Sequence, residues 1–156
     1  MRGRIAHGSM PFLGVSAISG MAEFLAALDS ELGPRLRQRR TRMPVEPPGA
    51  RASTLNVNSL HGGLAEDFQG LPSPLVADSC RAVLDRRFLL EENLDEVKRE
   101  IVDLLDRVKA ARPGLDWALR EIMTFHPTMT EPDAPVVRAL DASIRRVLGR
   151  PATHIA

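Results

Sequence analysis

Histidine is the most versatile acid, base and ligand at neutral pH, and the sequence holds four histidines: His7, His61, His126 and His154. None of them is followed two residues later by a carboxylate or four residues later by a second histidine, which are spacings that bring metal ligands together. The chain also has no pair of cysteines with zinc spacing. We therefore expect no metal ligand among these residues.

His7 is the strongest functional candidate because of the residues around it. Residues 3–14 read Gly-Arg-Ile-Ala-His-Gly-Ser-Met-Pro-Phe-Leu-Gly. A β-type segment ends at His7 beside small residues, and a helix begins only after Pro11 and Gly14, so the histidine is predicted on a constrained turn at a strand end. Such positions often carry function, although a lone histidine is more often a surface or packing residue.

The elements that must position His7 follow from the periodicity of apolar residues. A helix is predicted over 15–36, interrupted or ended by Gly33-Pro34, and a second helix starts at Asn93 as N-cap. Strands are predicted over 53–60, 78–89 and 117–125, in addition to the first strand before the His7 turn. Residues 34–51 and 61–78 are predicted as loops, and a third helix is predicted over 135–148.

This order is β-α-β-β-α-β, which predicts an α+β fold of the ferredoxin-like type. That fold is a two-layer sandwich with a four-stranded antiparallel sheet and both helices on one face. The helix over 135–148 has no place in the two-layer unit. We interpret residues 1–127 as one domain and residues 128–156 as a linker and the first helix of another domain.

The composition argues against several classes of partner. Lys and Arg total 21 against 20 Asp and Glu, so the formal charge of +1 gives no field that would attract nucleic acid or an anionic membrane. The arginine-rich stretch 35–42 is interpreted as a solvated loop. The absence of Tyr argues against an RNA-binding sheet, which needs stacking aromatics. The single cysteine, Cys80, is interpreted as a buried thiol, and we expect a cytoplasmic protein.

The segment around His7 resembles the signature Gly-x-x-Ala-His-Gly-Ser-x-Pro-x-x-Gly of a metal-dependent amidohydrolase and peptidase family. The signature lies in the lid, or dimerisation, domain of acetylornithine deacetylase, succinyl-diaminopimelate desuccinylase, aminoacylase and carboxypeptidase G. Residues 1–125 resemble that domain element by element, and residues 126–156 resemble the return into the catalytic domain. The resemblance implies an internal fragment of a longer chain, with the lid over 1–127 and a linker and the first helix of the truncated catalytic part over 128–156.

The resemblance also implies a role for His7. In the family, the equivalent histidine reaches into the active site of the other subunit, where its N–H stabilises the oxyanion formed as metal-bound water attacks an amide carbonyl. The parent is then expected to be a homodimer through its lid and to carry two zinc (or cobalt) ions in its catalytic domain. It is expected to hydrolyse N-acyl amino acids or small peptides. The fragment alone is expected to bind no metal and to be inactive.

Other polar residues carry weaker expectations. Arg87 matches an Asp-x-Arg pattern of the family and could hold a substrate carboxylate, but an ion pair with Asp85 is the slightly favoured interpretation. Glu91 and Glu92 resemble a catalytic pair of neighbouring glutamates, yet they precede a helix N-cap, where acidic groups stabilise the helix dipole, so we interpret them as structural.

Pro74 marks a departure from the family pattern. Many members have Asn-Val-Ile-Pro-Asp before the third strand, whereas this chain has Pro-Leu-Val-Ala-Asp over 74–78, so the substrate contact of that asparagine cannot be carried over. Asn56 and Asn58 are interpreted as polar groups at a strand edge. The alternative to a lid is a stand-alone ferredoxin-like binding or regulatory module without catalysis. That alternative explains the fold but neither the His7 turn nor the third helix.

Overall fold

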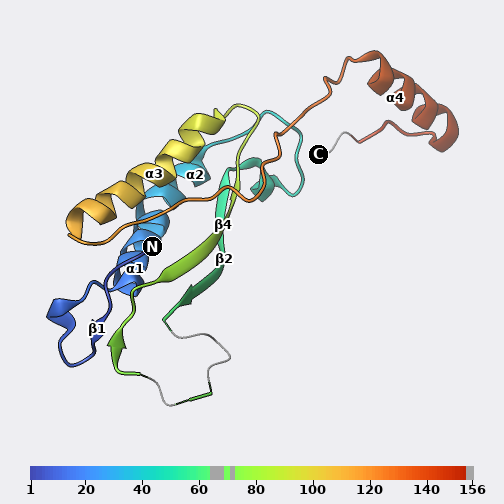
Figure 1. The fold of residues 1–156 in the computed structure, drawn as a ribbon. Coiled ribbons are helices and arrows are strands. Elements are labelled where there is room, and N and C mark those ends of the chain that lie inside the picture. Colours follow the sequence, from blue (N-terminus) through green and yellow to red (C-terminus); the bar gives the residue numbers. More distant parts are fainter. Residues whose placement is uncertain (64–68, 71–72, 154–156) are drawn as a thin grey trace.

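The fold, a computed structural model that describes residues 1–63, 69–70 and 73–153, is a mixed α+β arrangement with antiparallel strands (Figure 1). Its strands are β1 (Ala6–His7), β2 (Thr54–Gly62), β3 (Leu75–Val76) and β4 (Cys80–Arg87). Its helices are α1 (Ala17–Ala27), α2 (Gly33–Gln38), α3 (Leu94–Ala111) and α4 (Pro135–Leu148). The strands predicted over 53–60 and 78–89 and the three predicted helices are present. Part of the predicted loop, 64–68 and 71–72, lies outside the described residues, as do His154 and its two successors.

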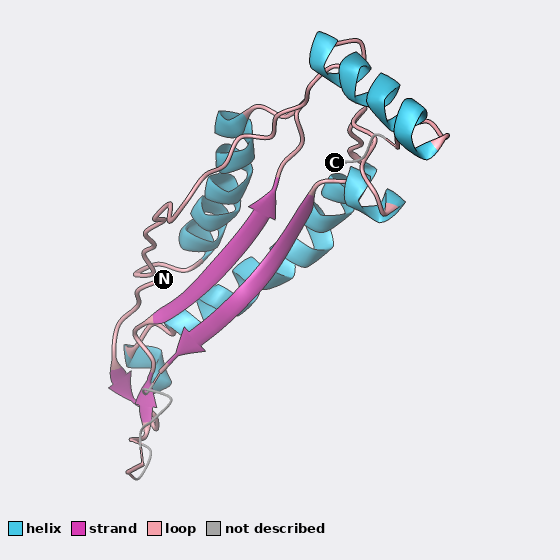
Figure 2. Cartoon of the chain, turned by 90° about the vertical axis from the view of Figure 1, so that its right-hand side faces the viewer, coloured by secondary structure: helices cyan, strands magenta, loops and turns pink. Residues whose placement is uncertain are grey.

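Two antiparallel ladders connect the strands. The long ladder joins β2 and β4, from Thr54 opposite Arg87 to Gly62 opposite Cys80, with an irregularity between Val57 and Ser59 (Figure 2). The short ladder joins β1 and β3 and places His7 opposite Leu75. Each sheet has two strands.

The predicted four-stranded sheet is therefore not formed in the described part of the chain. The missing strand is the one expected over 117–125, which has no strand assignment. In the ferredoxin-like order this strand pairs with the first strand, and the pairing begins where Arg2 lies opposite Asp116. In the described part of the chain, no backbone hydrogen bond of residues 118–125 continues this pairing, so these residues form no strand.

Of the two alternatives predicted for Gly33-Pro34, the helix is interrupted there and not ended, because helical structure continues to Gln38. A π-helical turn over Leu28–Leu32 precedes the proline, and the Gly33 N–H bonds to the Leu28 carbonyl. Pro34 then sits in the first turn of α2, where a missing N–H costs little. The π-helical turn thus allows helical structure to continue through Gly33-Pro34.

The core lies between one face of the long ladder and the helices. Cys80 is buried, and Ala82 and Leu84, which share its face of β4, pack against the same cluster. The helical members come from α1, its extension through α2, and α3, and they include Met21, Phe24, Leu28, Leu32, Leu36, Ile101, Leu104, Leu105 and Val108. Both helices thus cover one face of the ladder, as predicted.

α3 begins as predicted and α4 stands apart from the core. The Asn93 side chain caps α3 by accepting from the N–H groups of Asp95 and Glu96. α4 contains no buried residue and ends at Gly149, whose φ of 66° is left-handed. It projects away from the rest of the chain (Figure 1). Among the helices of the described residues, none combines the length and apolar character that crossing a bilayer requires.

Candidate functional site: the His7 turn

The His7 turn is a closed loop at one end of the molecule. Arg4 and Val15 exchange both backbone hydrogen bonds, at 2.9 and 2.8 Å, and so join the two ends of the loop. Within it, the Met10 N–H donates to the His7 carbonyl at 2.8 Å, which closes a tight turn directly after the histidine. A third contact comes from outside the loop, where the Gly8 N–H donates to the Pro74 carbonyl at 2.5 Å. The main chain of His7 is therefore fixed on both sides.

Two glycines of the motif are required by close packing. A Cβ at Gly3 would lie 2.0 Å from the Val15 carbonyl oxygen, and a Cβ at Gly14 would lie 2.9 Å from the Cβ of Ala6. Both distances are shorter than real Cβ contacts, so any larger residue would separate the two sides of the loop. The spacing of small residues in the sequence thus reflects how tightly this loop is folded.

The His7 side chain is exposed, and one of its ring nitrogens is occupied. The Ser9 N–H donates to Nδ1 at 3.2 Å, and the Ser9 Oγ lies 2.7 Å from the same nitrogen. A nitrogen that accepts from a backbone N–H carries no proton itself, so the proton of the neutral ring belongs on Nε2. The turn therefore presents Nε2–H as a donor facing away from its own backbone.

The loop that carries His7 also holds four exposed apolar side chains. Ile5, Met10, Phe12 and Leu13 are 57%, 42%, 76% and 52% exposed. Scattered apolar residues are normal on a protein surface, but four on one short loop form a patch of the kind that contacts another protein surface. The loop that carries His7 is thus also rich in exposed apolar side chains.

Arg87 lies at the far end of the long ladder from the His7 turn. β4 starts at Cys80, close to β1 and β3, and ends at Arg87, opposite Thr54 (Figure 1). The Arg87 side chain is 74% exposed, and its Nε and Nη2 each lie 2.9 Å from one oxygen of Asp85. The Asp85 ion pair considered from the sequence is present. Within one protomer, the structure does not bring His7 and Arg87 into one site.

Glu92 is the centre of a buried charge cluster that the sequence did not predict. Its carboxylate accepts from Arg39 at 2.5 Å, from Arg86 at 2.6 Å and from the Leu89 N–H at 2.7 Å. Burial by itself raises the pKa of Glu92, but these bonds and one from the Ser53 hydroxyl outweigh burial and lower the pKa. Arg39 also pairs with Glu100 of α3, so this arginine is not part of a solvated loop. The cluster joins the residue after α2, the residue before β2, the β4 strand and α3.

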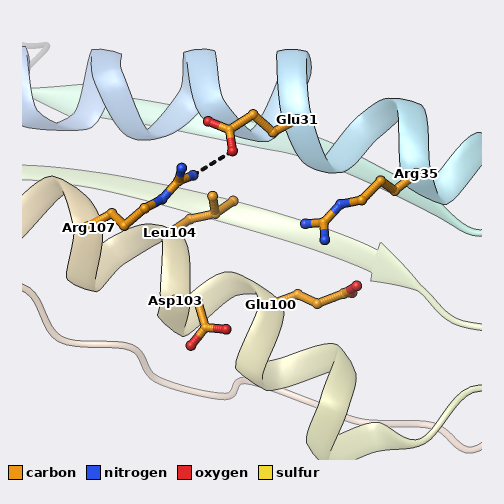
Figure 3. Close-up of a pocket in the computed structure, with 6 residues that line it drawn as sticks. All are labelled: Glu31, Arg35, Glu100, Asp103, Leu104 and Arg107. Atoms are coloured by element: carbon orange, nitrogen blue, oxygen red, sulfur yellow. Dashed lines mark hydrogen bonds and ion pairs between the residues drawn. The ribbon is translucent and has the colours of Figure 1, made fainter.

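One hollow in the described surface shows no catalytic arrangement. This hollow is a cleft of about 440 Å³ between α3 and the helical stretch formed by Leu28–Leu32 and α2 (Figure 3). Its lining residues are Glu31, Arg35, Glu100, Asp103, Leu104 and Arg107. Glu31 and Arg107 pair across it at 2.7 Å. It holds no nucleophile beside a base. In the described part of the chain, no three His, Cys, Asp or Glu side chains are grouped to hold a metal ion.

Three remaining residues, Cys80, Asn56 and Asn58, have the surroundings that the sequence indicated. Cys80 is 5% exposed, and burial raises the pKa of its thiol, which suits a packing residue. The Asn56 amide donates to Asn58 at 2.7 Å, so these side chains satisfy one another at the exposed edge of β2.

Together, the fold and the turn define a small α+β domain that presents a histidine at one end and an open strand edge along one side. The sequence profile of the peptidase dimerisation domain matches residues 1–113, and the chain belongs to this family. No curated protein matches the sequence.

Two solved structures share the fold. The aminopeptidase PepT from Bacillus cereus superposes with a TM-score of 0.62 at 20% sequence identity, over 99% of this chain and 35% of its own. A tripeptidase from Staphylococcus aureus superposes with a TM-score of 0.59 at 18% identity, over 99% of this chain and 34% of its own. The chain thus spans about a third of the length of these two proteins.

Proposed function

We propose that this chain is the lid and dimerisation module of a longer metal-dependent peptidase or amidohydrolase, and that His7 acts in the active site of a partner subunit. One observation carries the proposal: an exposed histidine is held on a braced turn with Nδ1 occupied and Nε2 directed away from the loop. A histidine that served only packing would not need this bracing. The exposed apolar side chains of this loop support contact of the turn with a second protein surface.

His7 would contribute a hydrogen bond to the reacting carbonyl. When a nucleophile adds to an amide carbonyl, negative charge develops on the oxygen, and a fixed N–H at that position stabilises the transition state. The Nε2–H of His7 is suited to this task because Ser9 holds the opposite side of the ring. The names of the two structural neighbours favour an amide bond in a short peptide as the substrate. The sequence resemblance adds N-acyl amino acids as the second candidate.

The metal ions of such an enzyme would lie outside this chain. The described residues offer no group of ligands that fits zinc or cobalt, and we propose that these ions belong to the catalytic part of the longer protein. Residues 128–156, with α4, would form the connection to that part. The proposed longer enzyme is cytoplasmic.

The edge of β2 is the proposed dimer contact. β2 pairs only with β4, so its other edge has unpaired backbone groups in the described chain. Val57 and Leu60 on this strand are 38% and 52% exposed. Two copies of β2 could pair antiparallel about a twofold axis and join the long ladders of two protomers into one sheet.

The test of His7 requires the longer protein. His7→Ala should lower kcat by on the order of 100-fold to 1000-fold and change KM little, because an oxyanion donor acts in the transition state. His7→Gln, which keeps a side-chain N–H donor, should retain part of the activity.

Mixing the subunits tests the action in trans. A His7→Ala subunit mixed with a subunit that lacks a metal ligand should regain activity, because one site of the heterodimer then combines an intact metal centre with an intact His7. If subunits exchange and no activity returns, His7 does not act in the partner's site.

A further inference from the structure

An apolar side chain shares the outward face of the first strand with His7. Ile5 precedes His7 by two residues, between the Arg4 bridge and the two residues of β1, and alternation along a strand puts side chains two residues apart on one face. Ala6 takes the opposite face, where it meets Gly14. The burial agrees, because Ile5 and His7 are exposed whereas Ala6 is half-buried. Ile5 therefore lies on the same side of the loop as the imidazole.

Met10 lies next to His7 across the tight turn. The bond from the Met10 N–H to the His7 carbonyl closes a four-residue turn, which holds the two Cα atoms within about 7 Å of each other. The Met10 carbonyl accepts from the Leu13 N–H at 3.1 Å, so both backbone groups of Met10 are bonded. Its side chain is 42% exposed. A flexible thioether on a fixed backbone can adapt to apolar groups of different shape that approach it.

The loop offers no ion-pair partner beside its histidine. Apart from the imidazole of His7, residues 5–14 contain no side chain that is charged at neutral pH. Arg4 comes just before this stretch, but alternation places it on the face of Ala6, and its Nε donates to the Leu13 carbonyl at 3.0 Å. A charged group that approached this loop would thus lose water without gaining a partner from it, whereas an apolar group would gain by contact with Ile5 and Met10.

The places of Ile5 and Met10 limit which part of a substrate they can meet. In the proposed function, the Nε2–H of His7 donates to the carbonyl oxygen at the scissile amide. Residues next to His7 then lie beside the groups attached to that amide, which are the side chains of the two residues it joins, or the acyl chain and one side chain. These groups are the part of the substrate that the loop can distinguish.

We propose that Met10, together with Ile5, determines specificity in the longer enzyme by selecting substrates whose side chain next to the scissile amide is apolar and uncharged. This inference rests on the proposed function, because the loop meets a substrate only when His7 enters the partner's active site. It narrows that function: among short peptides and N-acyl amino acids, those with an apolar group beside the cleaved bond are preferred to those with a carboxylate or an ammonium group there. Neither side chain takes part in the chemistry.

The test places charges of opposite sign at residue 10 of the longer enzyme. Met10→Lys, Met10→Glu and the uncharged control Met10→Gln are compared by kcat/KM on peptides with leucine, aspartate or lysine beside the scissile amide, on each side of it in turn. Wild type should prefer leucine to either charged residue by about 10-fold or more. Relative to Met10→Gln, Met10→Lys should raise the ratio of aspartate to lysine substrates by about 10-fold, and Met10→Glu should lower it by about 10-fold. Each ratio is taken on one enzyme preparation, so a misfolded or monomeric fraction cancels.

Two results would overturn the proposal: a wild-type preference for a charged residue, or ratios for Met10→Lys and Met10→Glu that differ by less than about 2-fold on both sides of the amide. His7→Ala separates this failure from failure of the proposed function. If His7→Ala lowers kcat on every substrate while charges at residue 10 leave the ratio unchanged, His7 acts in the site and the apolar side chains contact only the partner protein. If His7→Ala leaves kcat unchanged, the proposed function itself is wrong.

Discussion

Replacing Glu92 by glutamine should destabilise the fold far more than the same change at its neighbour Glu91. The Glu92 side chain is only 10% exposed and faces two guanidinium groups, of which that of Arg86 is 7% exposed. Glutamine preserves the shape of the side chain but removes the charge. Glu91 is exposed and accepts from the Arg42 N–H at 2.9 Å, so Glu91→Gln is the matched control.

The expected magnitude follows from the burial of the partners. Removing one member of a fully buried ion pair costs about 3–5 kcal/mol, because the other charge is left without compensation. Two features reduce that cost here: Arg39 is 31% exposed, and its second partner Glu100 remains. We therefore expect Glu92→Gln to lower the free energy of unfolding by about 2–3 kcal/mol and Glu91→Gln by less than about 1 kcal/mol.

Urea unfolding at several pH values measures this difference and its origin. The midpoint should fall by on the order of 1 M urea for Glu92→Gln at pH 7. The folded state lowers the pKa of Glu92 below its ordinary value of 4.5. Its ionised form therefore stabilises the fold above pH 4.5, and this contribution is lost as the pH falls through the folded pKa. The gap between wild type and variant should shrink on acidification. A gap under about 0.5 kcal/mol at pH 7, or one that does not change with pH, would refute the role of this charge.

Three further predictions concern the surface. Leu60→Lys should abolish self-association at high micromolar concentration, measured by sedimentation, because it places a charge on the exposed face of β2. Val147→Lys on α4 is the control and should leave self-association unchanged. If both variants changed self-association equally, the β2 edge would not be the dimer contact. Arg87→Ala should change stability by less than about 0.5 kcal/mol, since its pair with Asp85 is exposed. In the longer enzyme, Arg87→Ala should raise KM by about 10-fold to 100-fold if the guanidinium holds a substrate carboxylate. Arg81 is also exposed, so Arg81→Ala serves as the control. An unchanged KM would assign Arg87 to the ion pair alone. Nitrogen NMR above pH 8 should find the proton of His7 on Nε2, and a proton on Nδ1 would contradict the Ser9 contact.

The elements with local signals could be predicted from the sequence. The start of α3 needs only Asn93 and its two N–H partners, and its buried face follows from apolar residues three and four apart. The His7 turn was predicted for the same reason, because the small residues beside the histidine and Pro11 and Gly14 all lie within a few residues of it. What a residue does in such a turn is not encoded locally, and the roles of His7 and Arg87 stay predictions.

Features that depend on distant partners could not be predicted. Arg39 lies 53 residues from Glu92 and 61 from Glu100, and nothing in a run of five nearby arginines distinguishes the one that becomes buried. The strand expected over 117–125 fails for a related reason. Its alternation of apolar residues is real, but a strand also needs a neighbour, and in the described part of the chain the pairing stops at the bridge between Arg2 and Asp116. A pattern establishes the side-chain faces of a strand but leaves open whether its backbone is paired.

The two edges of the long ladder therefore have different consequences for assembly. The β2 edge is regular over most of nine residues and carries exposed Val57 and Leu60, so it suits pairing with an identical strand about a twofold axis. The β4 edge is already engaged at Met1, which exchanges two hydrogen bonds with Cys80. In the described part of the chain, the outer edge of β2 has no such partner, so it is the edge better suited to pairing with a second protomer. The His7 turn, with no buried residue over 4–14, stays outside that contact.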